Sequence, residues 1–426
     1  MKKFAVETIG CRLNQYETER IADQLTGLGL ERVPFNATAD LYIINTCTVT
    51  GRADASSRNI ISRAARRKEN PTVVVAGCYV NAEPDKVAHL NGVDLVVKNS
   101  EKENIGQILK SAFPGLFNAR ATAPPSKIIP EFFQHNRAWI KIGDGCNQRC
   151  AYCIIPLVRG ELTNRPAAEI AEEIRLLARN GYHEVVLTGV HIGRYRHGEI
   201  ESCAALVRHI LDETDIPRIR LSSIEPQEVD GELIQVMLDG GRRICRHLHI
   251  PLQSGSDRIL RLMRRPYNVE KYMKILAAAK IRLDGLIIGA DIIVGFPGET
   301  DEDFKQSVLA SDSEMIDYLH VFSYSDRPGT EASNMTDKIK PDVIKERNRI
   351  LREISQKHYA GALKREIGKT VYAISEYGTD NTGKNYWAVT DNYLKIILPE
   401  GIGGGREILK LKAIGASEKY LVGELK

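Results

Sequence analysis

Apolar runs alternate with amphipathic helical patterns over the N-terminal part of the chain. Runs of β-branched and aliphatic residues occupy positions 4–10, 40–46, 72–77 and 94–99, and helical patterns separate them. Continuous apolar runs with helices between them are typical of parallel strands that are buried on both faces and joined by right-handed crossovers. The pattern predicts an N-terminal α/β domain with a flavodoxin-like parallel sheet over residues 1–115.

The same alternation returns after a proline-rich stretch at residues 116–136, which we interpret as a linker. It predicts a second domain over residues 137–366, built as a partial (β/α)6 barrel that ends in a basic helix. In such a barrel the functional groups lie at the C-terminal ends of the strands and in the loops that follow. The six candidate strands span residues 139–143, 184–190, 218–224, 247–253, 285–296 and 318–325.

The pattern changes again over residues 367–426. Short alternating strands are broken there by Gly and Asn, which predicts a small, OB-like β-barrel. The helical segment before it, residues 338–369, carries ten Lys/Arg against four Asp/Glu.

Charge and composition narrow the partners only slightly. A formal net charge of +4 does not identify a nucleic-acid partner unless the charge clusters. The longest apolar stretch, residues 286–296, contains Asp291 and is far shorter than the roughly 18 residues that a membrane helix needs. The first apolar run is broken by Glu7, unlike that of a signal peptide. We therefore expect a cytoplasmic protein with no membrane partner.

Three cysteines lie close together directly after the first strand of the second domain. Cys146, Cys150 and Cys153 are separated by three and then two residues. Cysteine thiolates hold iron–sulfur clusters, and three of them leave one of the four irons of a [4Fe–4S] cluster free to bind a small molecule. A structural zinc site needs a fourth ligand, and none lies nearby in the sequence. The spacing favours a cluster over zinc.

Three more cysteines occupy equivalent topological places. Cys11, Cys47 and Cys78 each come just past the end of a predicted parallel strand. Since ligands of open α/β sheets bind at that edge, neighbouring strand ends can bring three thiols to one point. The alternative is three buried structural cysteines, because cysteine packs like a small apolar residue. Their common position favours a second cluster, whereas Cys203 and Cys245 are interpreted as plain buried thiols.

These motifs resemble a known family. The spacing at Cys146–Cys153, with Tyr152 before the third cysteine, resembles the radical S-adenosylmethionine (SAM) superfamily. GCRLNQYETE (10–19), NTCTVT (45–50) and AGCYV (76–80) resemble the N-terminal domain of its methylthiotransferases, and residues 385–399 resemble their RNA-binding TRAM barrel. Further similar segments are LTGVHIG (187–193), RLSSIEP (220–226), HIPLQSGSDRILRLMRR (249–265), DIIVGFPGET (291–300) and VFSYSDRPGT (321–330).

The resemblance implies two [4Fe–4S] clusters and SAM as cofactors. Cys146, Cys150 and Cys153 would ligate the cluster that cleaves SAM to a 5′-deoxyadenosyl radical, and Cys11, Cys47 and Cys78 the auxiliary cluster that holds the transferred sulfur. An external one-electron reductant is then a partner, and the source of the sulfur stays open.

The residues after Cys11 and around Cys47 resemble most the branch that acts on N6-threonylcarbamoyladenosine at position 37 of tRNA (t6A37). This predicts methylthiolation of C2, from t6A37 to ms2t6A37. Three alternatives remain: isopentenyladenosine-37, an aspartate of a ribosomal protein, and a non-enzymatic iron–sulfur RNA-binding scaffold.

Further residues are candidates for binding SAM or substrate. Most sit at predicted strand ends or in Gly/Pro turns, where core packing, helix capping or a simple turn is the competing interpretation. Asp291 lies within an apolar strand and needs a partner, so an internal hydrogen bond is the preferred interpretation there. His191, His197, His247 and His249 are interpreted as structural or surface residues. The cofactor candidates are Tyr152, Thr188, Gly189, Ser223, Glu225, Gln253, Asp291 and Gly295.

The RNA candidates combine basic and aromatic side chains in the C-terminal barrel. Aromatic rings among lysines suit base stacking and phosphate contact, although some of these rings are expected to belong to the barrel core. The candidates are Lys369, Lys384, Trp387, Tyr393 and Lys395.

Overall fold

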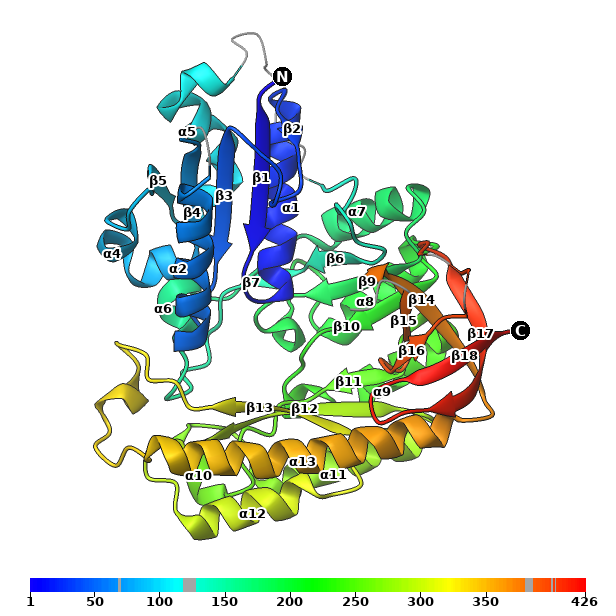
Figure 1. Ribbon diagram of the computed structural model, residues 1–426. Helices are drawn as coiled ribbons and strands as arrows, with labels where there is room; N and C mark the ends of the chain where they lie inside the picture. The colour runs from blue at the N-terminus through cyan, green and yellow to red at the C-terminus, as the bar shows by residue number, and fades with distance from the viewer. Residues whose placement is uncertain (68–69, 118–127, 380–385, 400, 403) are drawn as a thin grey trace.

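The structure is a computed structural model, and it describes residues 1–67, 70–117, 128–379, 386–399, 401–402 and 404–426. An N-terminal sheet stands against a curved wall of strands in the middle of the chain, and a small C-terminal barrel lies beside that wall (Figure 1). Among the described residues, no helix is long and apolar enough to cross a membrane.

The N-terminal sheet has five parallel strands in the order β2-β1-β3-β4-β5. The order is that of flavodoxin-like folds, as predicted. Helices α1 and α5 pack on one face and α2 and α4 on the other, because each helix buries one apolar stripe against the sheet. The elements are β1 (Lys3–Thr8), α1 (Arg12–Gly27), β2 (Glu31–Arg32), β3 (Leu41–Thr46), α2 (Gly51–Ala65), β4 (Thr72–Gly77), α3 (Cys78–Ala82), α4 (Pro84–Ala88), β5 (Leu95–Val97) and α5 (Ile105–Ala112).

All six predicted strands of the second region are present and parallel, which confirms the partial barrel. They form two three-stranded sheets that meet through single bridges, Ser223 with His249 and Ile219 with Ile244. The fourth strand is shorter than predicted, because Pro251 has no N–H to donate and Gln253 has a φ of 64°. The strands are β6 (Ala138–Lys141), β9 (Glu184–Thr188), β10 (Arg218–Leu221), β11 (His247–His249), β12 (Ile287–Val294) and β13 (Tyr318–Ser323).

The two faces of these strands differ in chemistry. In β12, Ile288, Ala290 and Ile292 belong to the large core beneath the helices, so Asp291 points to the opposite side, which we call the inner face. The helices on the outer face are α7 (Ala167–Arg179), α8 (Cys203–Glu213), α9 (Gly231–Gly240), α10 (Asp257–Leu262), α11 (Val269–Arg282), α12 (Asp301–Ser311) and α13 (Pro341–Glu366).

The described part of the predicted linker packs firmly. Ile129 and Phe132 are fully buried in the central core, and the Phe132 ring meets Trp139 edge to face at 5.5 Å. Residues 118–127, which contain two of its prolines, lie outside the described residues.

The C-terminal strands close into a small barrel in the order β14-β15-β16-β18-β17, which confirms that prediction. The predicted basic helix is α13, whose last turns place Ala362 and Leu363 in the barrel core. The strands are β14 (Thr370–Thr379), β15 (Tyr386–Thr390), β16 (Lys395–Ile397), β17 (Ile408–Ala416) and β18 (Leu421–Leu425).

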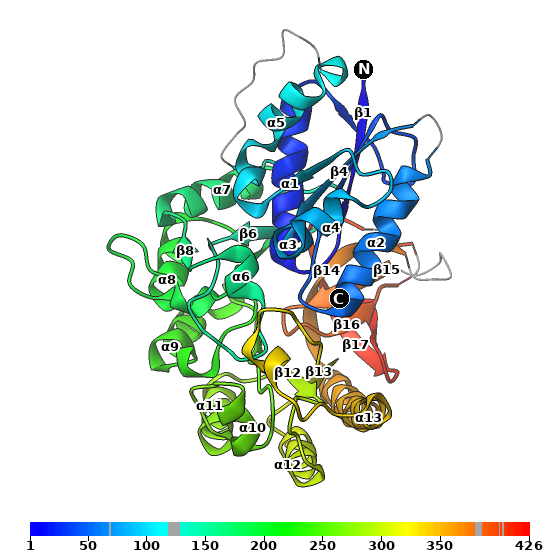
Figure 2. The same cartoon turned by 90° about the vertical axis from the view of Figure 1, so that its left-hand side faces the viewer.

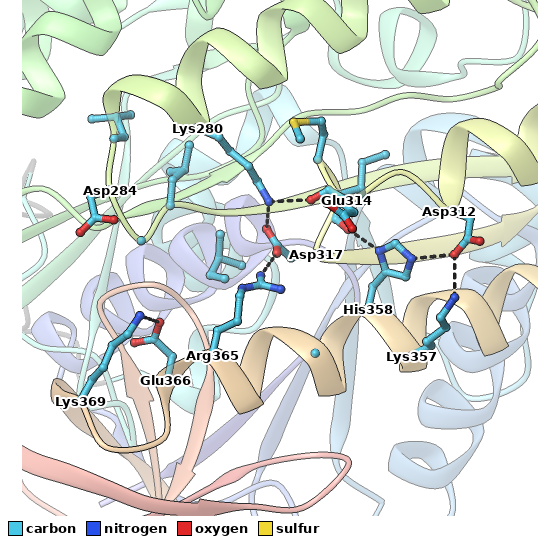
Figure 3. A pocket seen from close by; sticks show the side chains of 17 residues that line it. Lys280, Asp284, Asp312, Glu314, Asp317, Lys357, His358, Arg365, Glu366 and Lys369 are labelled. Carbon is cyan, nitrogen blue, oxygen red and sulfur yellow. Dashed lines mark hydrogen bonds and ion pairs between the residues drawn. The ribbon is translucent and has the colours of Figure 1, made fainter.

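A cavity of about 810 Å³ lies where α13 passes the N-terminal ends of β12 and β13. Its charged groups pair with one another across the gap: Lys280 with Asp317 at 2.9 Å, His358 with Asp312 at 2.8 Å, and Arg365 with Asp317 (Figure 3). These ion pairs fasten α13 to the central domain.

Candidate cluster and cofactor site

The cysteines at 11, 47 and 78, which we call the sheet triad, follow three neighbouring strands. Cys11 caps α1 after β1, Cys47 follows β3, and Cys78 opens α3 after β4. Gly10 has a φ of 109°, and a Cβ on it would lie 2.6 Å from Cβ of Cys47. Gly77 has a φ of 106°, and a Cβ there would meet the Thr46 carbonyl oxygen at 2.4 Å. These two glycines let the strand ends that carry the thiols approach one another.

The electrostatics of the sheet triad suit a positively charged inorganic partner. Burial, together with the nearby Cys11 and Cys78 thiols, raises the pKa of Cys47 to about 12. The pKa of Cys11 is also raised, first by surrounding protein and then by Cys78, although the Cys11 residue reaches solvent. Bare thiolates are therefore unfavourable at Cys11 and Cys47. A cysteine thiol gives up its proton when it binds a metal, and the metal then stabilises the thiolate. Three neighbouring cysteines therefore fit an iron–sulfur cluster.

The cysteines at 146, 150 and 153, the loop triad, lie between β7 (Gly143–Asp144) and α6 (Ile155–Arg159). The loop is pinned from two sides, because Ala151 donates its N–H to Met263 at 3.1 Å and its carbonyl accepts from Ala332 at 2.8 Å. The Cys153 N–H donates to the Cys150 carbonyl at 3.0 Å, which turns the two side chains back over one short loop. Burial raises the pKa of Cys153 to about 12, and the Cys150 and Cys146 thiols add to that shift.

Charged residues from other loops of the barrel contact the loop triad. Arg265, almost fully buried, donates to Cys150 Sγ at 3.3 Å and pairs with Glu225. His191 Nδ1 lies 3.6 Å from Cys146 Sγ, and its Nε2 lies 2.6 Å from Glu228. Burial opposes the charged imidazole, but the hydrogen bonds to Cys146 and Glu228 raise the pKa of His191 to about 9. Arg265 was not found from the sequence, and the interpretation of His191 as a structural or surface residue overlooked its contact with Cys146.

The sheet triad contacts the segment that follows the loop triad. Cys78 packs against Ile154 and Val158, which directly follow Cys153. Asn99 spans the junction, with its Nδ2 3.6 Å from Cys78 Sγ and 2.9 Å from the Val158 carbonyl oxygen. In Figure 2 the short helices α3 and α6 lie next to each other between the N-terminal sheet and the barrel strands, and they are in contact.

Two arginines fasten this junction. Arg159, whose side chain is 1% exposed, donates to Asn14 at 2.5 Å, Glu17 at 2.8 Å and Asp144 at 2.9 Å, so it joins the start of α1 to the loop triad. At the opposite side, Arg327 donates to Asp54 at 2.6 Å and to the Thr48 carbonyl at 3.2 Å, directly after Cys47.

The cofactor candidates separate into two groups. Thr188, Ser223 and Gln253 lie at or just beyond the C-terminal ends of β9, β10 and β11, at the end of the barrel where the ligands of such folds bind. Glu225 is at the same end and holds Arg265. A Cβ on Gly189 would lie 3.0 Å from the Gly143 carbonyl oxygen, so that glycine lets two loops meet.

The remaining candidates lie against other parts of the protein. Tyr152 packs on the small apolar cluster that contains Phe296. A Cβ on Gly295 would meet Ile344 of α13 at 2.4 Å, so Gly295 serves a helix contact. Asp291 is ion-paired on the inner face with His249 at 2.8 Å.

The RNA candidates also differ in their surroundings. Lys395 is exposed, Lys369 pairs with Glu366 at 3.1 Å, and the Trp387 ring meets Tyr420 at 5.0 Å. Tyr393 is half-buried and accepts a hydrogen bond from Arg12 at 2.6 Å. Lys384 lies outside the described residues.

A partial barrel of six parallel strands with three cysteines in the loop beyond its first strand defines a radical SAM protein. The sequence profile described as "Radical SAM superfamily" matches residues 140–309, and that described as "Uncharacterized protein family UPF0004" matches residues 3–98. The chain is 37% identical to the threonylcarbamoyladenosine tRNA methylthiotransferase MtaB of Bacillus subtilis, over 100% of this chain and 96% of that protein. It is also 33% identical to the tRNA-2-methylthio-N(6)-dimethylallyladenosine synthase of Acetivibrio thermocellus, over 83% and 78% of the two chains. The chain belongs to the radical SAM methylthiotransferase family, of the MtaB type.

Solved structures agree with the fold. The radical SAM methyltransferase TsrM of Kitasatospora setae superposes with a TM-score of 0.58 at 17% identity, covering 78% of this chain and 77% of that one. As a member of the radical SAM family, the protein uses SAM and an iron–sulfur cluster.

Proposed function

We propose that this protein is a tRNA methylthiotransferase that adds a methylthio group to C2 of N6-threonylcarbamoyladenosine at position 37. The observation that supports the proposal is the packing of Cys78, from the sheet triad, against Ile154 and Val158, which directly follow the loop triad. Generating a radical requires only the loop triad, so a second triad placed against it is what the delivery of sulfur to the activated substrate would need. The MtaB relatives support the choice of nucleoside.

Two [4Fe–4S] clusters are the cofactors of this proposal, besides SAM. Cys146, Cys150 and Cys153 would hold the first, and Cys11, Cys47 and Cys78 the auxiliary one. When bound, the clusters supply the electron that cleaves SAM and the sulfur that is transferred. An external one-electron reductant is then required.

The protein's own residues orient and protect this site. The Arg265 guanidinium favours the thiolate form of Cys150 and opposes the effect of burial on its pKa, while Glu225 holds the guanidinium in place. His191, fixed by Glu228, holds its Nδ1 against the sulfur of Cys146. Thr188, Ser223 and Gln253 bring polar groups to the same end of the barrel, where they would contact SAM. The packing of α3 on α6 buries Cys78 against Ile154 and Val158.

The C-terminal barrel would hold the tRNA. Lys395 is exposed on β16, and α13 adds exposed basic side chains along the helix that leads into the barrel. Such groups contact phosphates without reading sequence, and they make binding dependent on salt.

Nucleoside mass spectrometry of tRNA tests the proposal. A strain without the gene is expected to lack ms2t6A and to accumulate t6A, and expression of the wild-type chain should restore the methylthio nucleoside. Complementation with Cys47→Ala should leave t6A unmodified, whereas Cys203→Ala, a buried cysteine outside both triads, should restore ms2t6A.

Two outcomes would contradict the proposal in different ways. Loss of the methylthio form of isopentenyladenosine, with ms2t6A unchanged, would show that the nucleoside is wrong. Unchanged tRNA nucleosides would reject the RNA substrate itself.

A further inference from the structure

Three metal-ligating side chains meet on the inner face, apart from either triad. His249, Asp291 and His320 come from the adjacent strands β11, β12 and β13. Asp291 lies directly opposite His320 in the β12–β13 register, and His249 is opposite Gly289, two residues before Asp291. Parallel neighbours in register bring side chains of one face together, so three strands offer one ligand each.

The donor atoms converge on one point. His249 Nε2 is 2.8 Å and His320 Nδ1 is 3.4 Å from the same atom, Oδ1 of Asp291. All three ligand atoms lie within 4.8 Å of one another. Two donors that each sit about 2.1 Å from a metal ion are about 3.0–3.4 Å apart in octahedral or tetrahedral geometry. The two distances to Asp291 are therefore close to those between neighbouring ligands of a coordination shell.

The surroundings of the three residues are those of a ligand site with an open side. The His249 side chain is 8% exposed, that of Asp291 22% and that of His320 53%. His249 is oriented from behind, because its Nδ1 is 3.4 Å from the Tyr318 hydroxyl, which is itself 2.9 Å from His247 Nε2. With Nε2 facing the metal, Nδ1–H donates to that hydroxyl, which is the outer contact that metal-bound imidazoles usually make.

We propose that His249, Asp291 and His320 form a mononuclear site for a divalent cation of the zinc or ferrous class. Two imidazoles and one carboxylate suit those borderline cations better than Mg²⁺ or Ca²⁺, which prefer oxygen ligands only. The remaining coordination positions face the exposed side of His320 and take water or an oxygen of a bound molecule. The proposal rests on these three side chains alone and uses none of the six cysteines of the two triads.

Zinc binding to the full-length, cluster-loaded protein tests the site. Zn²⁺ is titrated calorimetrically under anaerobic reducing conditions, and zinc and iron are counted by mass spectrometry after desalting. The wild type should bind one zinc per chain with no loss of iron, which excludes displacement at the cysteines. His320→Ala should weaken zinc binding at least tenfold, and His197→Ala, another exposed histidine, should bind like the wild type.

A second pair of measurements guards against misfolded variants. His320→Gln keeps the size and polarity of the side chain, and Asp291→Asn keeps its shape without the charge. Both should retain the cluster absorbance of the wild type and lose the zinc. Anomalous diffraction at the zinc edge should place the ion between the three residues. No zinc on the wild type, or equal binding by His320→Ala, would overturn the proposal and leave a His–Asp–His hydrogen-bond network.

Discussion

The sheet triad and the loop triad each bring three thiols together, but they do so in different ways. The loop triad is contained in residues 146–153, and local turns bring its cysteines together. The sheet triad spans residues 11–78 and exists only because β1, β3 and β4 are neighbours in one parallel sheet. The first site is therefore encoded by spacing and the second by tertiary structure. The difference predicts that perturbing the fold will damage the sheet triad before the loop triad.

Removing single thiols gives the largest expected effect and separates the two sites. Cys150→Ala should abolish both SAM cleavage and tRNA methylthiolation, whereas Cys47→Ala should retain SAM cleavage and lose methylthiolation. In each case the iron content should fall from about eight to about four atoms per chain. Iron analysis and the yield of 5′-deoxyadenosine measure this. Cys203→Ala is the control, and equal loss of SAM cleavage in both variants would remove the distinction between the triads.

Arg159→Met should have the next largest effect, because it leaves Glu17 and Asp144 short of a buried partner at the junction. Losing one member of a buried ion pair costs about 3–5 kcal/mol, and Lys102, 2.6 Å from Glu17, offsets part of that. We expect a loss near the low end of that range, measured by chemical unfolding, and weaker magnetic coupling between the reduced clusters. Arg349→Met, an exposed ion-pair residue on α13, is the control, and its unfolding free energy should stay close to that of the wild type. Unchanged coupling in Arg159→Met would show that this arginine does not set the spacing of the sites.

Gly77→Ala should have a smaller effect, and this effect should be confined to the sheet triad. The added Cβ meets the Thr46 carbonyl oxygen, and the left-handed backbone adds strain of about 1–3 kcal/mol. The auxiliary iron should be partly lost while SAM cleavage stays near the wild-type rate. Gly29→Ala shares the left-handed backbone, with a φ of 84°, but has open space around it, so it should keep both clusters. If the two variants lose the same amount of iron, backbone strain rather than crowding at the strand ends is the cause.

The fold was largely predictable from the sequence, because buried parallel strands leave long apolar runs. All six barrel strands were found this way, and the closed C-terminal barrel followed from short alternating strands. The cysteines were found because their type is rare and their positions repeat. Arg159, Arg265 and Arg327 were not found, since an arginine has no sequence pattern that reveals its partner when that partner is far along the chain. His249 and His320 were missed as a pair for the same reason, because only the register of β11, β12 and β13 brings them together.

The position of a residue at the end of a strand was not enough to identify the residues that bind SAM. A glycine in a turn can admit a ligand or a neighbouring helix, and the sequence does not distinguish Gly189 from Gly295. In the structure, Gly295 lies against Ile344, while the roles of Thr188, Ser223 and Gln253 toward SAM remain predictions.

The contact between Arg12 and Tyr393 joins positions 381 residues apart. During synthesis the N-terminal domain emerges first and folds first, so for most of that time Arg12 has no hydroxyl to donate to. The sheet that carries Cys11 therefore has to hold its shape without this contact until residue 393 has left the ribosome. Completion of the C-terminal barrel is then the last event that fixes the residue next to Cys11.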